Sequence, residues 1–274
     1  MVGHTEWVEF GRVERVPAAG DIAHSTDAWE APGGGGAVAA VQLARLAGSC
    51  TFFTALGEDE RGAWSRRDLQ ALGVRVEASE RPEPNRRAFV LVDDQSERTI
   101  TTFGRRLDPT ERDELAWDEL EATDAAYVCA GSPEAIRLAR RAAVLVGTTR
   151  VMDLLDEADV ELDALVGSAR DAAERYATGR LTHPPGLLVL TEEAHGGTWQ
   201  TADGRGGAFD AVAPPGPMVD SYGAGDSFAA GLAFALASKM GLEATLRLAA
   251  RCGAWCVAGR GPYGNQLTAA DLER

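Results

Sequence analysis

The sequence predicts an α/β fold in which a central, mostly parallel sheet carries helices on both faces. From about residue 110, apolar strand-like runs alternate with segments of helical spacing, which is typical of parallel sheets. Two glycine-rich turns, one near each end of the chain, each lead into an apolar helix. A length of 274 residues with 45% hydrophobic residues allows one large α/β domain or two small ones.

The predicted elements follow the chain in order. The expected strands cover 6–10, 50–56, 88–92, 99–103, 125–129, 150–153 and 187–190, with a hairpin over 199–201 and 209–212. The expected helices cover 37–46, 111–121, 133–144, 228–238 and 243–258. Asp153, at the carboxyl end of an expected strand, would face the ligand crevice of such a sheet.

The charge of the chain excludes several classes of function. A formal net charge of −15 argues against a nucleic-acid or anionic-membrane partner. Lys239 is the only lysine and follows Ala237-Ser238, so the chain has no phosphate-binding P-loop, whose lysine directly follows glycine. Phosphate must therefore be bound by backbone amides or by arginine.

The cysteines and the apolar segments bear on metal binding and compartment. Of Cys50, Cys129, Cys252 and Cys256, only the last two are close, and their four-residue spacing on an expected helix suits adjacent buried thiols better than a metal site, which would need a second ligand pair. No apolar run has the length of a signal peptide or a bilayer span. We therefore expect a reduced, cytoplasmic protein.

The most informative stretch is Asp220-Ser221-Tyr222-Gly223-Ala224-Gly225-Asp226, which precedes the apolar helix over 228–238. A glycine turn at a helix N-terminus presents unpaired N–H groups and forms an anion site. A carboxylate at Asp226 beside such a site suits a group that handles a proton or a metal. The alternative is that Asp226 only caps the helix.

This stretch, continued by Ser227-Phe228, resembles the C-terminal signature of the ribokinase (PfkB) family of sugar and nucleoside kinases. The resemblance implies a ribokinase-like three-layer fold with a small β-sheet lid, built as a single domain over 1–274 with lid elements at about 9–30 and 86–104. It implies that Asp226 takes the proton from the substrate hydroxyl. The amides from Gly223 through Ala224 and Gly225 to Asp226 would form the anion hole for the phosphoryl group.

The N-terminal glycine turn resembles the first signature of that family. It runs from Gly33 to Gly36 and opens a helix. The resemblance implies that Gly34, Gly35 and Gly36 let the backbone approach the sugar. The family usually has an asparagine that contacts substrate where this chain has Val38.

The same resemblance suggests further substrate contacts. Glu9, with Glu6 second, matches an acid on the first strand that contacts substrate hydroxyls, although an exposed strand charge is an equal alternative. The hairpin carrying Arg98 resembles the lid sheet, which covers the substrate and often forms a homodimer contact. Arg98, Arg105 and Arg106 could approach an anionic group, but exposed arginines are more often only solvated.

The nucleotide and metal contacts come last. Thr191 and Gly196 match a loop at the nucleotide, with Glu193 in place of a glycine. Ser168 and Asp171 stand where the family usually has an Asn-x-x-Glu motif that supports Mg²⁺, or else they simply start a helix. Family members often hold K⁺ or another monovalent cation near the segment equivalent to Asp220, Ser221 and Tyr222.

We therefore expect an ATP- and Mg²⁺-dependent kinase that phosphorylates a hydroxymethyl group of a sugar or sugar-like molecule. A nucleoside kinase of the same fold is one alternative. A non-catalytic sugar- or nucleotide-binding family member is another, suggested by Val38, Glu193 and the Ser168/Asp171 pair. A dehydrogenase is a remote possibility, because Gly34-x-Gly36-x-x-Ala39 only formally matches a dinucleotide fingerprint.

Overall fold

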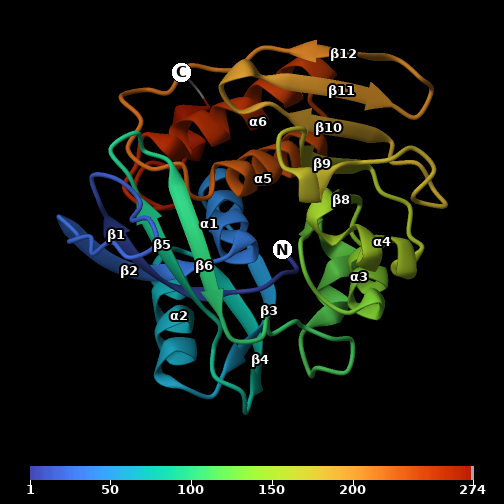
Figure 1. The fold of residues 1–274 in the computed structure, drawn as a ribbon. Helices are drawn as coiled ribbons and strands as arrows, with labels where there is room; N and C mark the ends of the chain where they lie inside the picture. The colour runs from blue at the N-terminus through green and yellow to red at the C-terminus, as the bar shows by residue number, and fades with distance from the viewer. Residues whose placement is uncertain (273–274) are drawn as a thin grey trace.

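A computed structural model describes residues 1–272. Its central sheet is mostly parallel, as expected (Figure 1). Parallel pairing joins β3 to β4 and runs through β7, β8, β9 and β10, while β11 and β12 add antiparallel strands at one edge. Val2 bridges Phe53 and Val128 and so connects the two parts of the sheet. The strands are β3 (Thr51–Gly57), β4 (Arg75–Arg81), β7 (Ala125–Val128), β8 (Val144–Thr148), β9 (Ala164–Ser168), β10 (Leu187–Thr191), β11 (Gly197–Thr201) and β12 (Gly206–Phe209).

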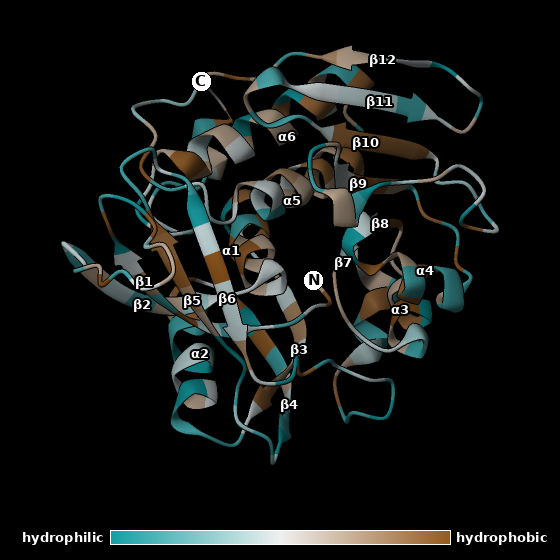
Figure 2. Cartoon of the chain, viewed as in Figure 1, coloured by the Kyte–Doolittle hydropathy of each residue, from teal (hydrophilic) through white to brown (hydrophobic). Residues whose placement is uncertain are grey.

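Helices cover both faces of this sheet. Successive strand residues point to opposite sides, so each strand supplies apolar side chains to both faces. Val166 and Val189 pack in the cluster that includes residues of the helices α1, α2, α5 and α6, whereas Leu165 and Leu188 pack with α3 and α4. β10 is accordingly one of the strongly hydrophobic elements in Figure 2. The α-helices are α1 (Gly35–Ala47), α2 (Glu60–Ala71), α3 (Pro133–Ala139), α4 (Met152–Ala158), α5 (Ala224–Ala237) and α6 (Leu242–Val257). The 3₁₀ helices are η1 (Trp117–Ala122), η2 (Thr149–Val151), η3 (Ala172–Glu174), η4 (Glu193–His195) and η5 (Ala269–Asp271).

A second sheet of four strands, here called the lid sheet, stands beside the glycine turns (Figure 1). Its order is β2-β1-β5-β6. On its inner face Val8, Phe10 and Val90 are buried, and Phe10 stacks on Trp29 and contacts the Tyr222 ring edge-on. The strands are β1 (Glu6–Arg12), β2 (Asp27–Gly33), β5 (Arg87–Val92) and β6 (Arg98–Phe103).

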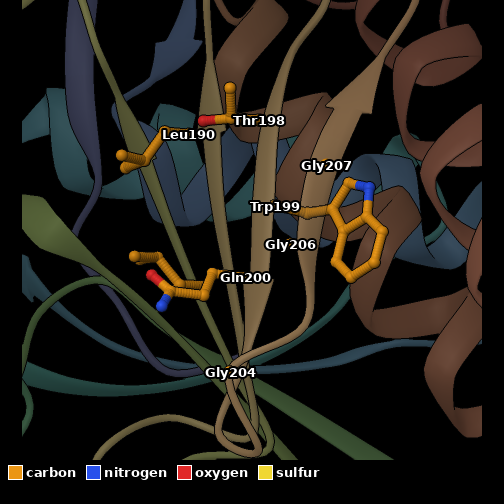
Figure 3. A pocket seen from close by; sticks show the side chains of 8 residues that line it. Leu190, Thr198, Trp199, Gln200, Gly204, Gly206 and Gly207 are labelled. Carbon is orange, nitrogen blue, oxygen red and sulfur yellow. The ribbon is translucent and has the colours of Figure 1, made fainter.

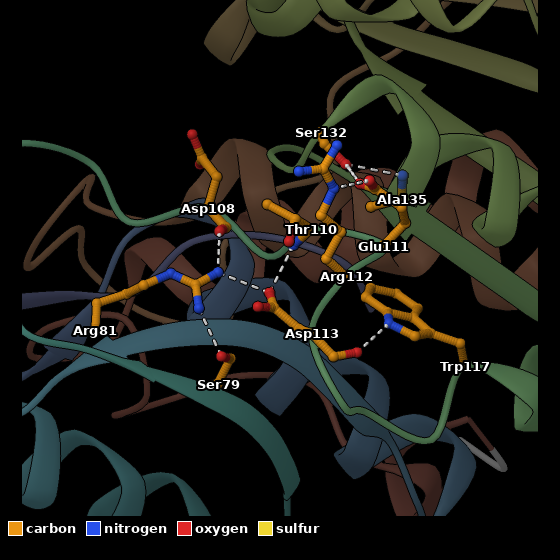
Figure 4. Close-up of polar contacts among 10 residues, drawn as sticks. All are labelled: Ser79, Arg81, Asp108, Thr110, Glu111, Arg112, Asp113, Trp117, Ser132 and Ala135. Carbon is orange, nitrogen blue, oxygen red and sulfur yellow. Dashed lines mark hydrogen bonds and ion pairs between the residues drawn. The ribbon is translucent and has the colours of Figure 1, made fainter.

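Four predicted elements differ from the structure. The second hairpin strand, expected over 209–212, is β12 at 206–209, and the helix expected over 133–144 ends at Ala139. The segment 111–121 forms turns and then η1, because its polar groups bind the backbone locally, as Figure 4 shows. The Asp113 carboxylate accepts from the Thr110 N–H at 2.7 Å and from Arg81 at 2.7 Å. The Trp117 indole donates to the Asp113 carbonyl at 3.1 Å.

The strand expected over 150–153 lies earlier, at β8, because the buried apolar run begins at Val144 and α3 already ends at Ala139. Asp153 consequently lies in α4, where it is exposed and pairs with Arg180, and it does not face a ligand crevice.

One buried hydrogen bond ties the two glycine turns together. The Tyr222 hydroxyl accepts from the Gly34 N–H at 2.9 Å, although the two residues are 188 positions apart. Gly34 has φ +84°, and Tyr222 is only 6% exposed. The bond therefore fixes the N-terminal turn against the C-terminal one.

We predict that Tyr222→Phe destabilises the fold. The substitution leaves the Gly34 N–H buried without an acceptor, which costs about 1–3 kcal/mol. Urea unfolding of the two proteins measures this difference. An unchanged midpoint and slope would show that the bond contributes no net stability.

Candidate active site

The C-terminal glycine turn presents free backbone donors. Gly223 has φ +85° and caps α5, and the first intrahelical bond runs from the Ser227 N–H to the Gly223 carbonyl at 2.9 Å. The amides of Ala224, Gly225 and Asp226 thus have no partner within the helix. Gly225 is exposed, and a Cβ there would meet no described atom within 4 Å. Open space therefore lies over an anion-binding helix terminus.

Asp226 lies where the two glycine turns meet. A Cβ on Gly35 would come within 2.6 Å of the Asp226 Oδ1 and 3.6 Å of the Cys129 Sγ. A Cβ on Gly34 would lie 3.0 Å from the His4 ring and 3.3 Å from Glu6. The structure thus brings the turn formed by Gly34, Gly35 and Gly36 next to the predicted base, and residues 3–6 pack against this turn.

Burial raises the pKa of Asp226, while the fields of Arg150 and Arg98 oppose that rise and Glu174 adds to it. A carboxylate with a raised pKa is a stronger base than a solvated one. Burial, with help from nearby arginines, also lowers the pKa of His4 to about 3. His4 is therefore a neutral group of the site at neutral pH.

Of the two acids considered on β1, Glu6 lies beside the N-terminal glycine turn and Glu9 does not. Glu9 pairs in register with Glu30 and Phe89 on the outer face of the lid sheet and lies 3.5 Å from Arg87. Glu6 is buried, lies 3.2 Å from Arg86, and has a pKa raised by burial. The strand's two-residue period decides this, because residues of opposite parity point to opposite faces.

Val38 is 0% exposed and packs within the core cluster that includes Val8 and Tyr222. A Cβ on Gly223 would meet its Cγ1 at 2.9 Å, so Val38 lies directly under the C-terminal turn. In this structure Val38 supports that turn by packing, and its side chain has no open surface through which to contact a substrate.

The sequence analysis missed Glu174. This side chain is 5% exposed and accepts from the Ser168 N–H at 3.0 Å, and Arg150 forms an ion pair with it. Asp171, the acid singled out from the sequence, caps η3 and lies 3.6 Å from Arg150. Glu174 follows Ser168 by six residues, a spacing that matches no motif, so only its burial identifies it.

The remaining predicted contacts lie on neighbouring loops. The Thr191 hydroxyl donates to the Gly167 carbonyl at 3.3 Å, and the Ala169 N–H donates to the Thr191 carbonyl at 2.9 Å. Gly196 has φ +82°, and a Cβ there would lie 2.0 Å from the Phe209 carbonyl oxygen, so the turn admits only glycine. Thr191 is the last residue of β10 and Gly196 lies in the loop after it. Open α/β sheets bind ligands at this carboxyl end of their strands.

Asp220 joins the turn before α5 to the chain after α6. Its carboxylate is 0% exposed and accepts from the Tyr222 N–H at 2.8 Å and the Gly261 N–H at 3.1 Å. Burial raises its pKa. Among residues 1–272, no group of three or more His, Cys, Asp or Glu side chains is arranged to hold a metal ion. Asp171, expected to support Mg²⁺, follows β9, whereas Asp220 and Tyr222, expected near a monovalent cation, precede α5.

Arg98 reaches the site from the lid sheet. Its Nη1 donates to the Ser221 hydroxyl at 3.3 Å.

A hollow elsewhere on the surface, about 320 Å³ in volume, lies over β10, β11 and β12 (Figure 3). Leu190, Thr198 and Gln200 line it, and it includes none of the residues predicted to bind substrate, nucleotide or metal. Within the described residues, no helix has the length and apolar character needed to cross a membrane.

Comparison with known proteins identifies the family. The description "pfkB family carbohydrate kinase" matches residues 1–158 and 148–269. The ATP-dependent ribose-1-phosphate kinase of Halopiger xanaduensis is 28% identical over 92% of this chain and 89% of its own length.

Solved structures show the same fold. The ribokinase of Thermotoga maritima has a TM-score of 0.78 with 18% identity, covering 99% of this chain and 96% of its own. The nucleoside kinase of Methanocaldococcus jannaschii has a TM-score of 0.74 with 18% identity, covering 99% and 95%. This chain therefore belongs to the pfkB family of carbohydrate kinases, with a ribokinase-like fold and the ATP-dependent sugar kinase activity of that family.

Proposed function

We propose that this protein transfers the γ-phosphoryl group of ATP to a hydroxymethyl group of a sugar or sugar-like molecule, with Asp226 as the general base. The observation that carries the proposal is the position of the Asp226 carboxylate, 2.6 Å from the Cβ position of Gly35 and in the first turn of α5. A substrate seated on the N-terminal glycine turn would present its hydroxyl to this carboxylate. The amides of the C-terminal turn that have no partner within α5 would bind the phosphoryl group beside it.

Each residue then has a defined role in the proposed reaction. The ionised Asp226 accepts the hydroxyl proton, and its raised pKa favours that transfer. Gly35 is partly exposed and would admit the substrate, whereas Gly34 and Gly36 are buried against His4 and would shape the turn beneath it. Glu6 supplies a buried acceptor for a substrate hydroxyl, held in place by Arg86 at 3.2 Å.

The family uses ATP, generally with Mg²⁺. We place the nucleotide beside Thr191 and Gly196, at the carboxyl end of β10. The oxygen donors that suit Mg²⁺ here are the carboxylates of Glu174 and Asp171. Bound Mg²⁺ would neutralise charge on the phosphates, and Glu174 would orient its water ligands from a buried position.

A monovalent cation is a further part of the proposal. The Asp220 carboxylate accepts one backbone N–H at each oxygen, and each oxygen keeps a second lone pair for a cation. K⁺ bound there would order the turn from Asp220 to Gly223. Comparing rates in K⁺, Na⁺ and choline chloride at equal ionic strength separates this role from a general salt effect.

A nucleoside kinase of the same fold is the second candidate. The fold shared with the nucleoside kinase of Methanocaldococcus jannaschii is what supports it. A panel of sugars, polyols, sugar phosphates and nucleosides separates the candidates by kcat/KM. A non-catalytic binding protein would bind ATP or sugar and turn over none of them.

We predict that Asp226→Asn lowers activity without lowering stability. Loss of the base should lower kcat by about 10²–10⁴-fold, measured by ATP consumption with the best substrate of the panel. The folded-state pKa of Asp226 is raised, so its charged form is disfavoured in the fold and the neutral amide should not lower stability at neutral pH. Urea unfolding measures the second effect. Retention of wild-type kcat would refute the assignment of Asp226.

We also predict the acidic limb of the pH profile. The base acts only when ionised, and its pKa lies above the ordinary 3.8. The kcat/KM value should therefore fall as pH decreases through that raised pKa, while the fold gains stability from protonation of Asp226 over the same range. A limb at or below pH 3.8, in protein that stays folded by circular dichroism, would contradict the prediction.

We propose a homodimer that forms through the lid sheet. β6 is an edge strand with every residue exposed, and Phe89 and Phe103 are 42% and 47% exposed on the outer face. Edge strands and exposed aromatic side chains favour pairing with another chain.

Substitution of both Phe89 and Phe103 by Glu should therefore give a monomer in size-exclusion chromatography with light scattering, because the added charges cannot be buried at a dimer contact. Met240→Glu is a matched control, since Met240 is 37% exposed and follows α5, outside the lid elements. A wild-type protein that is monomeric at micromolar concentration would contradict the proposal.

A further inference from the structure

We propose that His4 determines acceptor specificity, by binding one hydroxyl group of the acceptor in the space between its imidazole ring and the Glu6 carboxylate. The inference rests on the proposed kinase function of the same site. It adds a residue that no sequence motif singled out, and it names a chemical group that the acceptor must carry. It is carried by the position of the ring, by its neutral charge state, and by its unused hydrogen-bonding groups.

The first observation is the position of the ring. A Cβ on Gly34 would lie 3.0 Å from the His4 Cδ2 atom and 3.1 Å from its Nε2. A Cβ on the next residue, Gly35, would lie 2.6 Å from the Asp226 Oδ1. Consecutive Cα atoms are about 3.8 Å apart, so His4 and the proposed base lie against adjacent residues of one turn. A group held by His4 therefore belongs to the acceptor and not to the nucleotide, which we place at the carboxyl end of β10.

The second observation is that the ring is neutral. Burial lowers the pKa of His4 to about 3, and the fields of nearby arginines add to this effect. A neutral imidazole has one nitrogen that donates a hydrogen bond and one that accepts. His4 therefore offers the acceptor a hydrogen bond without a positive charge.

The third observation is that the hydrogen-bonding groups of the ring are unused. The His4 side chain is 15% exposed, and within residues 1–272 neither ring nitrogen has a hydrogen-bond partner. Nδ1 is buried. Nε2 lies 3.7 Å from the Glu6 Oε1, which exceeds the upper limit of about 3.2 Å for an N–H···O hydrogen bond. We assign the ring proton to Nε2, because there it faces a carboxylate.

A hydroxyl group completes the gap between this donor and this acceptor. Two hydrogen bonds of about 2.8 Å that meet at one oxygen bridge a separation of 3.7 Å. The hydroxyl oxygen accepts from the Nε2–H of His4, and the hydroxyl hydrogen donates to Glu6. An ionised phosphate or carboxylate has no hydrogen to donate to Glu6, and an ammonium group cannot accept from Nε2. The pair therefore selects a hydroxyl group by the type of its hydrogen bonds.

The charges around this space are already paired. Burial raises the pKa of Glu6, and Arg86, 3.2 Å away, opposes that rise and so favours the carboxylate. The other arginines whose fields act on His4 are each paired with an acid, Arg106 with Asp108 and Arg150 with Glu174. A neutral hydroxyl group leaves this balance undisturbed, whereas an anionic group would face the Glu6 carboxylate.

The test compares the acceptor with its deoxy analogues in the wild type and in His4→Phe. The probes are the best acceptor of the panel and its monodeoxy analogues, which for D-ribose are 2-deoxy-D-ribose and 3-deoxy-D-ribose. We expect the wild type to discriminate against one analogue by about 10²-fold in kcat/KM, because that analogue leaves both His4 and Glu6 unpaired. His4→Phe should reduce this discrimination by about tenfold, since only the bond to Glu6 remains.

Two further variants separate the hydrogen bond from packing. His4→Gln carries an amide nitrogen that reaches the region of Nε2, so it should keep more of the discrimination than His4→Phe. His183→Phe is the matched control, because the His183 Nε2 also lies 3.7 Å from an acid, Asp159. That pair lies at the C-terminus of α4, where the His183 side chain is 44% exposed, so this variant should discriminate as the wild type does.

The ratio of two kcat/KM values does not depend on how much of a variant is folded, so a destabilised His4→Phe protein still gives a result. An equal loss of kcat/KM for the acceptor and for every deoxy analogue would show that His4 acts only through packing, and it would overturn the proposal. A wild type that phosphorylates every monodeoxy analogue as well as the parent acceptor would also overturn it. A wild-type protein that turns over no acceptor would instead refute the proposed function itself.

Discussion

The site depends on one close contact, between the N-terminal glycine turn and the first turn of α5. A side chain at Gly35 would displace the Asp226 carboxylate, because its Cβ would lie 2.6 Å from the Asp226 Oδ1. The Tyr222 hydroxyl holds the same two turns together through the Gly34 N–H. Backbone therefore lies against the carboxylate on one side, and free helix amides lie on the other. A base and an anion site can share one small space only because glycine occupies both turns.

That arrangement places a carboxylate where burial disfavours its charge. The raised pKa of Asp226 is the direct consequence, and the fields of Arg150 and Arg98 only partly oppose it. The two arginines come from different parts of the fold, one after β8 and one from the lid sheet. Arg150 forms an ion pair with Glu174, whereas Arg98 donates a hydrogen bond to the neutral Ser221 hydroxyl.

The first residues of the chain connect the central sheet to the lid sheet. Val2 bridges β3 and β7, while Glu6 already begins β1 of the lid sheet. His4 and Glu6 fall between the two sheets, beside Gly34. The lid sheet is thus continuous in the chain with the middle of the central sheet, and its inner face is aligned with the glycine turns.

The sequence alone determined the α/β class, the family, and the two glycine turns, because these depend on local patterns that only a few backbone geometries satisfy. It also singled out Asp226, whose place in the first turn of α5 follows from its spacing to Gly223. The tertiary structure decided what depends on which side chains meet. Through strand parity it put Glu6, and not Glu9, beside the glycine turn, and it buried Glu174, whose spacing matched no motif. Val38 likewise packs under Gly223, a contact between residues 185 positions apart along the chain. Such contacts arise from packing between distant segments, and local sequence patterns carry no record of them.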